Sequence, residues 1–474
     1  MRISSGKEKV ETIVSAEPSA QRNRLLEVKR GLGKKLSVNN PGELLSWWIA
    51  EDAFELPTET IETLRRGGEA LNRFFSVANE LFYREPWIQK RLEKRISPNY
   101  HLLNHAQRKA LPRMPRPDVI LDRMWRPKFV ELEITVGSRA DTAMMAEEYG
   151  LNDDLNDGPN ERRHGLIKSY ADFIKKHWPG KTLGLVTAHH SFFLDLPDDA
   201  NAFASMLRRT GLDVVVLTDE TLPYLRFDGR QLLLYRRTGV PVPIHIMDRF
   251  LDIYEIAEMQ HPGMSAILDA YLAEAVIDVN TCKQFLDEKD WMALFWEPCM
   301  RETWRNELGE EYDLMLRDLI PRTWLVHADQ EVKLAGGGAA GGEKVPILKL
   351  GDLRPDERQF VIKESGTSTT SSGAQSLKVL SEMSGQETHR LIRDLVNSSV
   401  PFIIQETVDS PRISFTALDP YDDRVITQHG ARLKLSAFYC DGKMLDIRLV
   451  ASNAKLAVND LDYVVGVVRY DEEM

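Results

Sequence analysis

The sequence predicts a mixed protein with α+β and α/β parts, divided into several domains. The first 110 residues show helical periodicity, residues 163–250 alternate helix-like with strand-like runs, and the last third is rich in strand-like runs. These three observations together predict the fold class. A chain of 474 residues exceeds the roughly 100–200 residues of a typical domain, so we expect two to four domains.

The N-terminal region, residues 1–110, is expected to be helical. Its segment IETLRRGGEALNRFFSVANELFYREPW repeats apolar residues at spacings of three and four, the pattern of an amphipathic helix. We expect Trp47, Trp48, Phe74 and Phe75 on buried helix faces. The region carries no chemical motif, and two roles stay open for it: a cap over a substrate pocket, or a contact in a homodimer.

A β-hairpin is predicted in the second unit, residues 111–160. DVILD and KFVELEI are strand-like, and the polar, proline-containing turn RMWRP separates them. Residues 161–255 predict a parallel sheet, because the helix-like runs HGLIKSYADFIKKHW and NAFASMLRRTG alternate with the strand-like runs TLGLVTA, DVVVLT and QLLLYR. No GxGxxG follows the first of these strands, so a dinucleotide site has no support.

The last unit, residues 256–474, is expected to begin with helices and to end in strands. LIPRTWLV is a turn followed by a strand, and AGGGAAGGE (335–343) has the composition of a surface loop. The later strand-like runs are RQFVIKES, PFIIQETV, ARLKLSAFYCDGKMLDIRLVAS and DYVVGVVRY.

The bulk composition excludes several partners and compartments. A net charge of −11 argues against nucleic acid and gives no support to an anionic membrane as partner. Cys282, Cys299 and Cys440 form no CxxC pair, which fits a reducing cytosol and no zinc site. There is neither an apolar signal-peptide core nor a run of about 20 apolar residues, so we expect a cytoplasmic protein.

Three acidic residues on the predicted hairpin could act together. Residues two apart in a strand face the same side, so Glu131 points with Glu133, and Arg116 points with Asp118. Two readings stay open: a solvent-facing polar side of an edge hairpin, or a magnesium site, since Mg²⁺ takes hard oxygen ligands and shares carboxylates with substrate phosphates.

The segment VIKESGTSTTSSGAQSL (361–377) could hold phosphate groups. A strand carries Lys363, a Gly/Ser/Thr loop follows, and a helix-like run comes next. Such a loop offers backbone N–H groups and hydroxyls to phosphate oxygens, and lysine adds a point charge. The alternative is a Ser/Thr-rich connector without a ligand.

Three further segments carry little information by themselves. PFIIQETVDSP (401–411) is an apolar strand whose polar end, Gln405 and Glu406, could meet an adenine edge. Lys289 begins a helix in EKDWMALFWEP, where a solvated lysine is the simpler reading. His189 and His190 follow a strand, but adjacent histidines point in different directions and favour packing or loop roles.

Taken in order, these segments resemble the ATP-grasp superfamily of carboxylate–amine ligases. The R-P-D of residues 116–118 precedes the E-L-E of residues 131–133, and Glu131 follows Asp118 by 13 residues, the spacing of that family's metal hairpin. The hairpin stands first here, as in the circularly permuted group related to glutathionylspermidine synthase. Later segments that resemble the group's landmarks are IHIMDRF, EKDWMALF, LIPRTW, FVIK, IIQETV, LDIRLVAS and AVN.

The resemblance covers about residues 112–470. It implies an ATP-grasp fold in circularly permuted order, with a Rossmann-like pre-ATP-grasp domain over 161–255 and nucleotide-binding subdomains over 256–474. It further implies an ADP-forming ligase that makes an amide bond through an acyl phosphate, with ATP and Mg²⁺ as cofactors and a small-molecule carboxylate and amine as substrates. The sequence departs from the family at Glu133, which stands in place of the usual Asn, and in a phosphate loop rich in Ser and Thr where the group is rich in Gly.

The resemblance also assigns roles to individual residues. The implied metal ligands are Asp118, Glu131 and Glu133. The implied ATP-binding residues are Lys289, Lys363, Ser365, Gly366, Thr367, Ser368, Gly373, Gln405, Glu406, Val408 and Asp409. Arg116 and Arg448 are placed to meet the acyl phosphate or the carboxylate, and Asn459 belongs to the same late segment as Arg448.

Three alternatives to a ligase stay open. The first is a nucleotide-binding protein that does not ligate, which the Ser/Thr-rich loop and Glu133 motivate. The second is a kinase of the same fold that phosphorylates a small molecule. The third is a structural protein that Mg-ATP does not stabilise.

Overall fold

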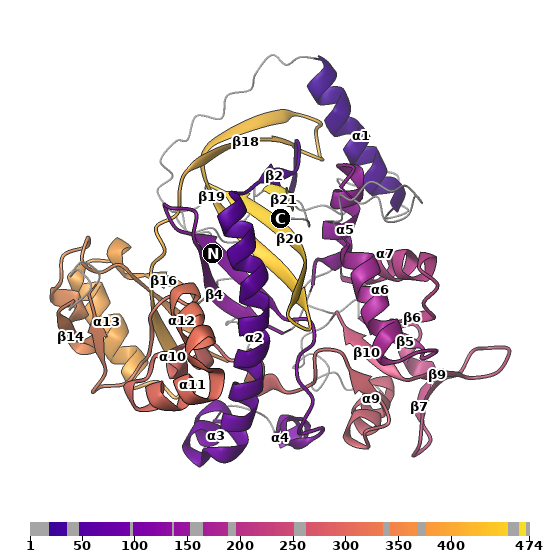
Figure 1. Cartoon of the computed structure of the whole chain (residues 1–474), viewed down its shortest axis with the longest axis horizontal. Helices are drawn as coiled ribbons and strands as arrows, with labels where there is room; N and C mark the ends of the chain where they lie inside the picture. Colours follow the sequence, from indigo (N-terminus) through magenta and orange to yellow (C-terminus); the bar gives the residue numbers. More distant parts are fainter. Residues whose placement is uncertain are drawn as a thin grey trace.

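A computed structural model describes the chain over residues 19–35, 47–94, 98–134, 137–151, 165–187, 196–250, 262–334, 342–366, 376–453 and 464–470. Among these residues, no helix is both long enough and apolar enough to cross a membrane. Strands from both ends of the chain meet in one large central sheet, with smaller sheets on either side (Figure 1).

The large sheet joins segments that are far apart in the sequence. Its strand order is β18 (Ile413–Leu418), β1 (Trp48–Ala50), β21 (Val464–Arg469), β20 (Lys443–Ser452), β19 (Val425–Cys440), β3 (Arg116–Leu121) and β4 (Pro127–Glu133), and β2 (Phe54–Glu55) pairs with β21. The predicted hairpin is confirmed as β3 and β4, and β3 pairs on its other side with β19. The sheet therefore places the hairpin beside the late strands of the chain.

Both faces of this sheet are covered. Ile447 and Leu449 of β20 belong to the apolar core that includes helix α2 (Thr58–Arg84), whereas Val450 belongs to the core that includes α5 (Arg139–Glu148) and α6 (Leu166–His177). Alternate residues of a strand face opposite sides, so one strand supplies both cores. This coverage explains why β20 is apolar along most of its length rather than alternating.

The N-terminal region is mostly helical, as predicted, but it also contributes strands. Its helices are α1 (Ser19–Lys35), α2, α3 (Pro86–Leu92) and α4 (Pro98–His105). Phe74 and Phe75 are buried on α2, as expected. The helical expectation for Trp48 is wrong, because Trp48 begins β1, which pairs with β21 and β18. The neighbouring Trp47 is buried but lies outside any helix. Pairing with strands more than 350 residues away overrides the local pattern.

The predicted parallel sheet is confirmed. Its order is β11 (Ile277–Asp278), β10 (Ile246–Arg249), β5 (Leu183–Val186) and β6 (Val214–Leu217), and its helices are α6, α7 (Leu196–Arg209) and α9 (Pro262–Leu272). Its last strand lies beyond residue 255, where we predicted the unit to end. The run QLLLYR does not join it: β8 (Leu232–Leu234) pairs antiparallel with β7 (Leu225–Phe227) and β9 (Val242–Ile244), after the short helix η2 (Leu222–Tyr224).

Along the chain, a group of helices comes between the parallel sheet and the main strands of a second small sheet. They are η3 (Gln284–Asp287), α10 (Asp290–Trp296), η4 (Pro298–Met300), α11 (Arg301–Leu308) and α12 (Glu310–Leu319). The small sheet has the order β12 (Thr323–Leu325), β17 (Phe402–Glu406), β15 (Phe360–Glu364) and β16 (Lys378–Val379). This antiparallel sheet carries the predicted strands FVIK and PFIIQ.

The remaining elements cover the small sheet. They are β13 (Glu331–Lys333), β14 (Lys344–Pro346), η5 (Ile347–Asp352), η6 (Leu380–Glu382) and α13 (Gly385–Val396). Helix α13 begins at a capping box in which Ser384 and Glu387 satisfy each other's backbone N–H groups. Most of the helix-like run expected at the end of the Ser/Thr-rich segment lies outside the described residues, and its last residues, Ser376 and Leu377, are not helical. Strand β16 follows and pairs with Val361 and Ile362 of β15. Residues 335–341 of the predicted glycine loop lie outside the described residues, as do His189 and His190.

Candidate active site

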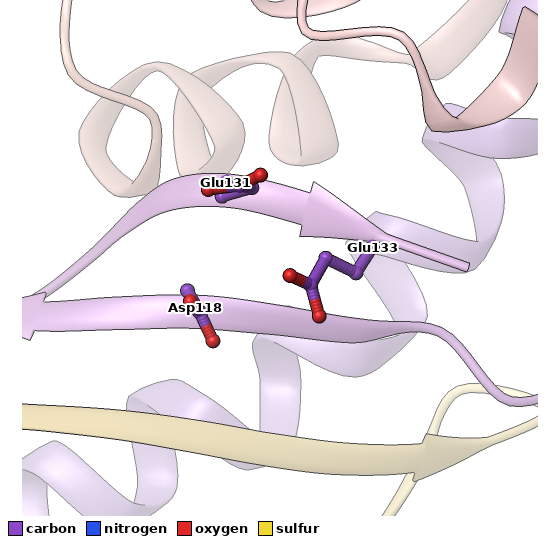
Figure 2. A group of neighbouring side chains, drawn as sticks. All are labelled: Asp118, Glu131 and Glu133. Atoms are coloured by element: carbon purple, nitrogen blue, oxygen red, sulfur yellow. The ribbon is translucent and has the colours of Figure 1, made fainter. Parts of the chain in front are cut away.

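The three acidic residues of the hairpin converge on one spot, as the sequence predicts. Asp118 of β3 lies directly opposite Glu131 of β4, and Arg116 lies opposite Glu133. One oxygen of each carboxylate lies within 4.8 Å of the others, and Figure 2 shows Asp118, Glu131 and Glu133 on the two paired strands. We call these three residues the carboxylate triad. The strands shift register between Asp118 and Val119, an irregularity of the kind found beside active sites.

The triad is not the solvated side of an edge hairpin. The Asp118 side chain is only 8% exposed, and Glu131 and Glu133 are each 26% exposed. Every member pairs with a cation: Asp118 with Lys434 at 2.9 Å, Glu131 with Lys289 at 2.7 Å, and Glu133 with Arg116. Buried carboxylates are costly unless they are paired in this way, so the arrangement is a polar cluster held inside the protein.

Asp118 is held by two residues of β19 that the sequence reading missed. Lys434 donates to Asp118 Oδ2 at 2.9 Å, and the Ser436 hydroxyl donates to Oδ1 at 2.9 Å. Burial alone would raise the pKa of Asp118, but Lys434 and Arg116 outweigh it and lower that pKa to about 2. The signal for these residues was present in the run LKLSA, where polar residues alternate with apolar ones.

Lys289 reaches the triad from the start of α10. Its ammonium lies 2.7 Å from Glu131 Oε1, so the reading of a solvated lysine is wrong. Burial acts to lower the pKa of Lys289, but the Glu131 carboxylate raises it by more. The segment is anchored to the hairpin by its neighbour Asp287, which accepts the N–H of Ile134 at 2.7 Å.

Lys363 approaches the triad from the small sheet. It is buried on β15, and it donates to Val130 O at 2.7 Å and to Gln405 Oε1 at 3.0 Å. Burial lowers the pKa of Lys363 to about 8, against the opposing attraction of Glu131. The two lysines, 74 positions apart in the sequence, thus meet at one strand of the hairpin.

The predicted adenine segment lies beside Lys363, but it is not a sheet edge. Gln405 is buried, and its amide also donates to Thr323 Oγ1 at 3.2 Å. Strand β17 lies between β12 and β15, and the N–H of Glu406 bonds to Arg322 O at 2.9 Å. Burial raises the pKa of Glu406. The backbone of β17 is therefore already paired on both sides. Only its side chains and the residues after Glu406 are left to contact an adenine ring.

Two further predicted site residues, Val408 and Asp409, follow this strand. Val408 is half-buried. Asp409 is exposed and forms an ion pair at 2.7 Å with Arg123, in the turn between β3 and β4. Asp409 is thus near the tip of the hairpin, not at the acids.

The start of the predicted phosphate loop is fixed by a third residue that the sequence analysis missed, Glu288. The buried Ser365 hydroxyl donates to Glu288 Oε2 at 3.1 Å and accepts the N–H of Asp290 at 2.9 Å. Gly366 follows with a φ of 121°, which only glycine adopts without strain. Burial, and then repulsion from Asp290, raise the pKa of Glu288 to about 8. Thr367, Ser368, Gly373 and Asn459 lie outside the described residues.

Arg448 joins the site through strand register. Asp118, Ser436 and Arg448 are direct neighbours across β3, β19 and β20, so the three side chains stand in one row. Arg448 also forms an ion pair at 3.1 Å with Asp141 of α5. Burial lowers the pKa of Arg116, and the positive charge of Arg448 lowers it further. Two guanidinium groups that repel each other in a buried place would be stabilised by an anion between them.

Comparison with known proteins establishes a fold. No family model matches the chain, and no curated protein matches it. Among solved structures, it is similar to a glutathione synthetase-like effector from Globodera pallida in its apo form, with a TM-score of 0.58 and 13% identity over 96% of this chain and 98% of that one. It also matches a proposed gamma-glutamylcysteine synthetase from Methylobacillus flagellatus over 86% of this chain and 88% of that one, but that TM-score of 0.38, at 10% identity, carries no argument. The chain thus shares a mixed α/β fold with the glutathione synthetase-like protein along nearly its whole length.

Proposed function

We propose that this protein is an ATP-dependent, ADP-forming ligase of the circularly permuted ATP-grasp type that joins a small-molecule carboxylate to an amine. The observation that carries the proposal is the meeting of Lys289 and Lys363 at the hairpin strand of Glu131. Acids and lysines from separate elements, gathered in a buried place, are typical of a site for a metal-bound polyphosphate. The fold shared with a glutathione synthetase-like protein supports the same reading.

The carboxylate triad fits magnesium. Its members offer hard oxygen ligands within 4.8 Å of one another, which is what Mg²⁺ prefers. Asp118, Glu131 and Glu133 would hold one or two such ions. When bound, the metal supplies charge neutralisation for phosphate oxygens.

The nucleotide is proposed to lie between the small sheet and the hairpin. Lys289 and Lys363 supply positive charge toward its phosphates, and Ser365 and Gly366 begin the loop that covers them. The proposed base and ribose contacts are Gln405, Glu406, Val408 and Asp409. Thr367, Ser368 and Gly373 keep their proposed roles in the phosphate loop.

The two arginines are proposed to hold the carboxylate substrate. Arg116 and Arg448 lie on the same face of the sheet as Asp118, and their forked donors match carboxylate and acyl-phosphate oxygens. In the overall reaction, the carboxylate gains the γ-phosphoryl group and ADP leaves. The amine then forms a bond to the acyl carbon, loses a proton and releases phosphate.

The proposal is tested by ADP release from ATP across a panel of carboxylates combined with amino acids and small polyamines. We expect Glu131→Gln to lower ADP release by about 100-fold or more, because a ligand carboxylate and the partner of Lys289 are lost together. The matched control is Glu148→Gln, since Glu148 also pairs with a lysine, Lys35, and is 19% exposed, but it lies outside the site.

Three results would contradict a ligase. Near wild-type ADP release from Glu131→Gln would refute the role of the triad. Stabilisation by Mg-ATP without ADP release across the panel would indicate a binding protein that does not ligate. A stable phosphorylated product formed without an amine would indicate a kinase.

A further inference from the structure

The carboxylate triad already contains its own counter-charges. Its three acids carry three negative charges, and Lys434, Lys289 and Arg116 pair with them one to one. Lys363 adds a fourth cation within reach of Glu131. A divalent ion entering this cluster alone would therefore meet a site that is balanced, not one with an excess of negative charge.

Lys434 is the cation placed most firmly at Asp118. It stands on β19, where Lys434 and Ser436 bracket the two oxygens of the Asp118 carboxylate at 2.9 Å each. Strand β19 is paired on both sides, with β3 and β20, so neither the lysine backbone nor the aspartate backbone is free to move away. Only the lysine side chain, which is 13% exposed, can exchange its partner.

We propose that Lys434 is a resident counter-ion of the carboxylate triad that couples metal binding to polyphosphate binding. A bare metal ion must displace the ammonium from Asp118 and leave it buried without an anion, which is costly. A polyphosphate that arrives with the metal supplies oxygens for the displaced ammonium. Metal and polyphosphate therefore bind together more tightly than either binds alone. The proposal rests on the proposed function for the identity of the polyphosphate, ATP.

The opposing explanation is that Lys434 only neutralises a buried aspartate to keep the hairpin folded. Removing Lys434 would then weaken folding and leave metal affinity unchanged or lower. The proposal requires the opposite sign: without the ammonium, Asp118 lacks its paired cation and the metal no longer meets the repulsion of that charge, so bare metal binds more tightly.

The experiment is a Mn²⁺ titration of the full chain, followed by electron paramagnetic resonance, with and without a non-hydrolysable ATP analogue. Without the analogue, we expect Lys434→Met to bind Mn²⁺ about tenfold more tightly than wild type, since about 1.4 kcal/mol of lost repulsion corresponds to that factor. The analogue should raise the Mn²⁺ affinity of wild type by a larger factor than that of Lys434→Met. Because coupling is reciprocal, Mn²⁺ should raise the analogue's affinity by the same factor.

Two further variants keep the test decisive. Lys29→Met is the matched control, because Lys29 is also 13% exposed and pairs with an aspartate, Asp423. Lys29 lies far from the triad in the sequence, so the Mn²⁺ affinity of this variant should equal that of wild type. Lys434→Gln keeps a hydrogen-bond donor for Asp118 without the charge, and it should match Lys434→Met even if the latter folds poorly. Lys434→Arg keeps the charge and should behave as wild type.

Unchanged or weaker Mn²⁺ binding in both Lys434→Met and Lys434→Gln would overturn the proposal. Equal Mn²⁺ affinity of wild type with and without the analogue would also overturn it. Failure of the proposed ligase function gives a different result. Wild type would then bind Mn²⁺ and the analogue in a coupled way, the coupling would be weaker in Lys434→Met, and no ADP would be released from ATP.

Discussion

Two of the charged clusters that the protein buries differ in how completely they are closed. In one, Arg139 of α5 pairs with Asp248 of β10, and both side chains are 0% exposed. The Tyr170 hydroxyl donates to the same carboxylate at 2.6 Å, and the Arg139 guanidinium lies over the rings of Phe203 and Phe250. This closed pair ties α5, which follows the hairpin, to the parallel sheet.

The carboxylate triad is the open cluster. Its side chains are partly exposed, its cations outnumber its acids, and its partners come from the large sheet, α10 and β15. A pair with one arginine, one carboxylate and an aromatic enclosure has no place for a ligand. Under the proposed function, the lysines of the open cluster exchange a carboxylate for a phosphate. The comparison indicates that burial alone does not distinguish a candidate ligand-binding cluster from a structural ion pair. The difference lies in how many charged side chains could exchange their present partner for a ligand.

The largest expected effect is in the closed pair. Asp248→Ala should lower the free energy of unfolding by about 3–5 kcal/mol, because it leaves a buried guanidinium without its carboxylate. Urea unfolding followed by circular dichroism measures this loss. By contrast, Glu131→Gln in the open cluster should change the free energy of unfolding by less than about 1 kcal/mol, since the glutamine oxygen still accepts a hydrogen bond from Lys289 and the repulsion from Asp118 is removed.

An apolar replacement of the whole pair checks that explanation. Arg139→Met combined with Asp248→Leu should recover most of the stability that Asp248→Ala loses, because a buried ion pair contributes little beyond an apolar pair of similar size. If the double variant were as unstable as Asp248→Ala, the closed pair would have a role other than mutual neutralisation.

In the open cluster, Lys363→Met should affect binding more than folding. Burial holds the pKa of Lys363 at about 8, so the charged form is disfavoured and its removal should cost little stability. The affinity for Mg-ATP should fall by about 10–100-fold, the loss of a charge-assisted contact. Isothermal titration calorimetry measures this affinity. The control is Lys128→Met, a lysine of the same hairpin that pairs with Asp318. A variant that loses stability and keeps its affinity would place Lys363 among the structural residues.

The sequence predicts one half of the open cluster well, because that half is local. The hairpin acids lie in two short strands joined by one turn, so period-two alternation and cross-strand pairing suffice to bring Asp118, Glu131 and Glu133 together. Lys363 was predicted from the Gly/Ser/Thr loop that follows its strand, and the family resemblance agreed. Lys289 was found only through that resemblance, because its own run does not distinguish it from a solvated lysine.

The other half depends on register between distant strands, which no local pattern encodes. Lys434 and Ser436 reach Asp118 only because β19 pairs with β3 across more than 300 residues of sequence. The same cause explains the wrong prediction for Trp48, whose strand pairs with β18 and β21. Glu288 was missed because its partner, Ser365, follows β15, 77 residues later in the sequence. Local periodicity thus identifies elements, whereas long-range pairing decides which of their polar residues meet.

The smallest expected effect is at Glu288. Like the closed pair, Glu288 is buried, but its carboxyl group accepts a hydrogen bond from the Ser365 hydroxyl rather than from a cation. Its pKa is raised from 4.5 to about 8, so its contribution to stability is fully present below pH 4.5 and is lost as the pH rises toward 8. Glu288→Gln cannot ionise, and at pH 6 it should therefore be about 1 kcal/mol more stable relative to wild type than at pH 5, since one pH unit between the two pKa values corresponds to at most about 1.4 kcal/mol. Urea unfolding at both values measures the difference. Glu387→Gln is a control in which the dependence of stability on pH has the opposite sign. Hydrogen bonds from Ser384 lower the pKa of Glu387, so the contribution of Glu387 to stability is lost as the pH falls. If wild type and Glu288→Gln responded to pH in parallel, the ammonium of Lys289 would outweigh burial, and Glu288 would belong to the charged side of the open cluster.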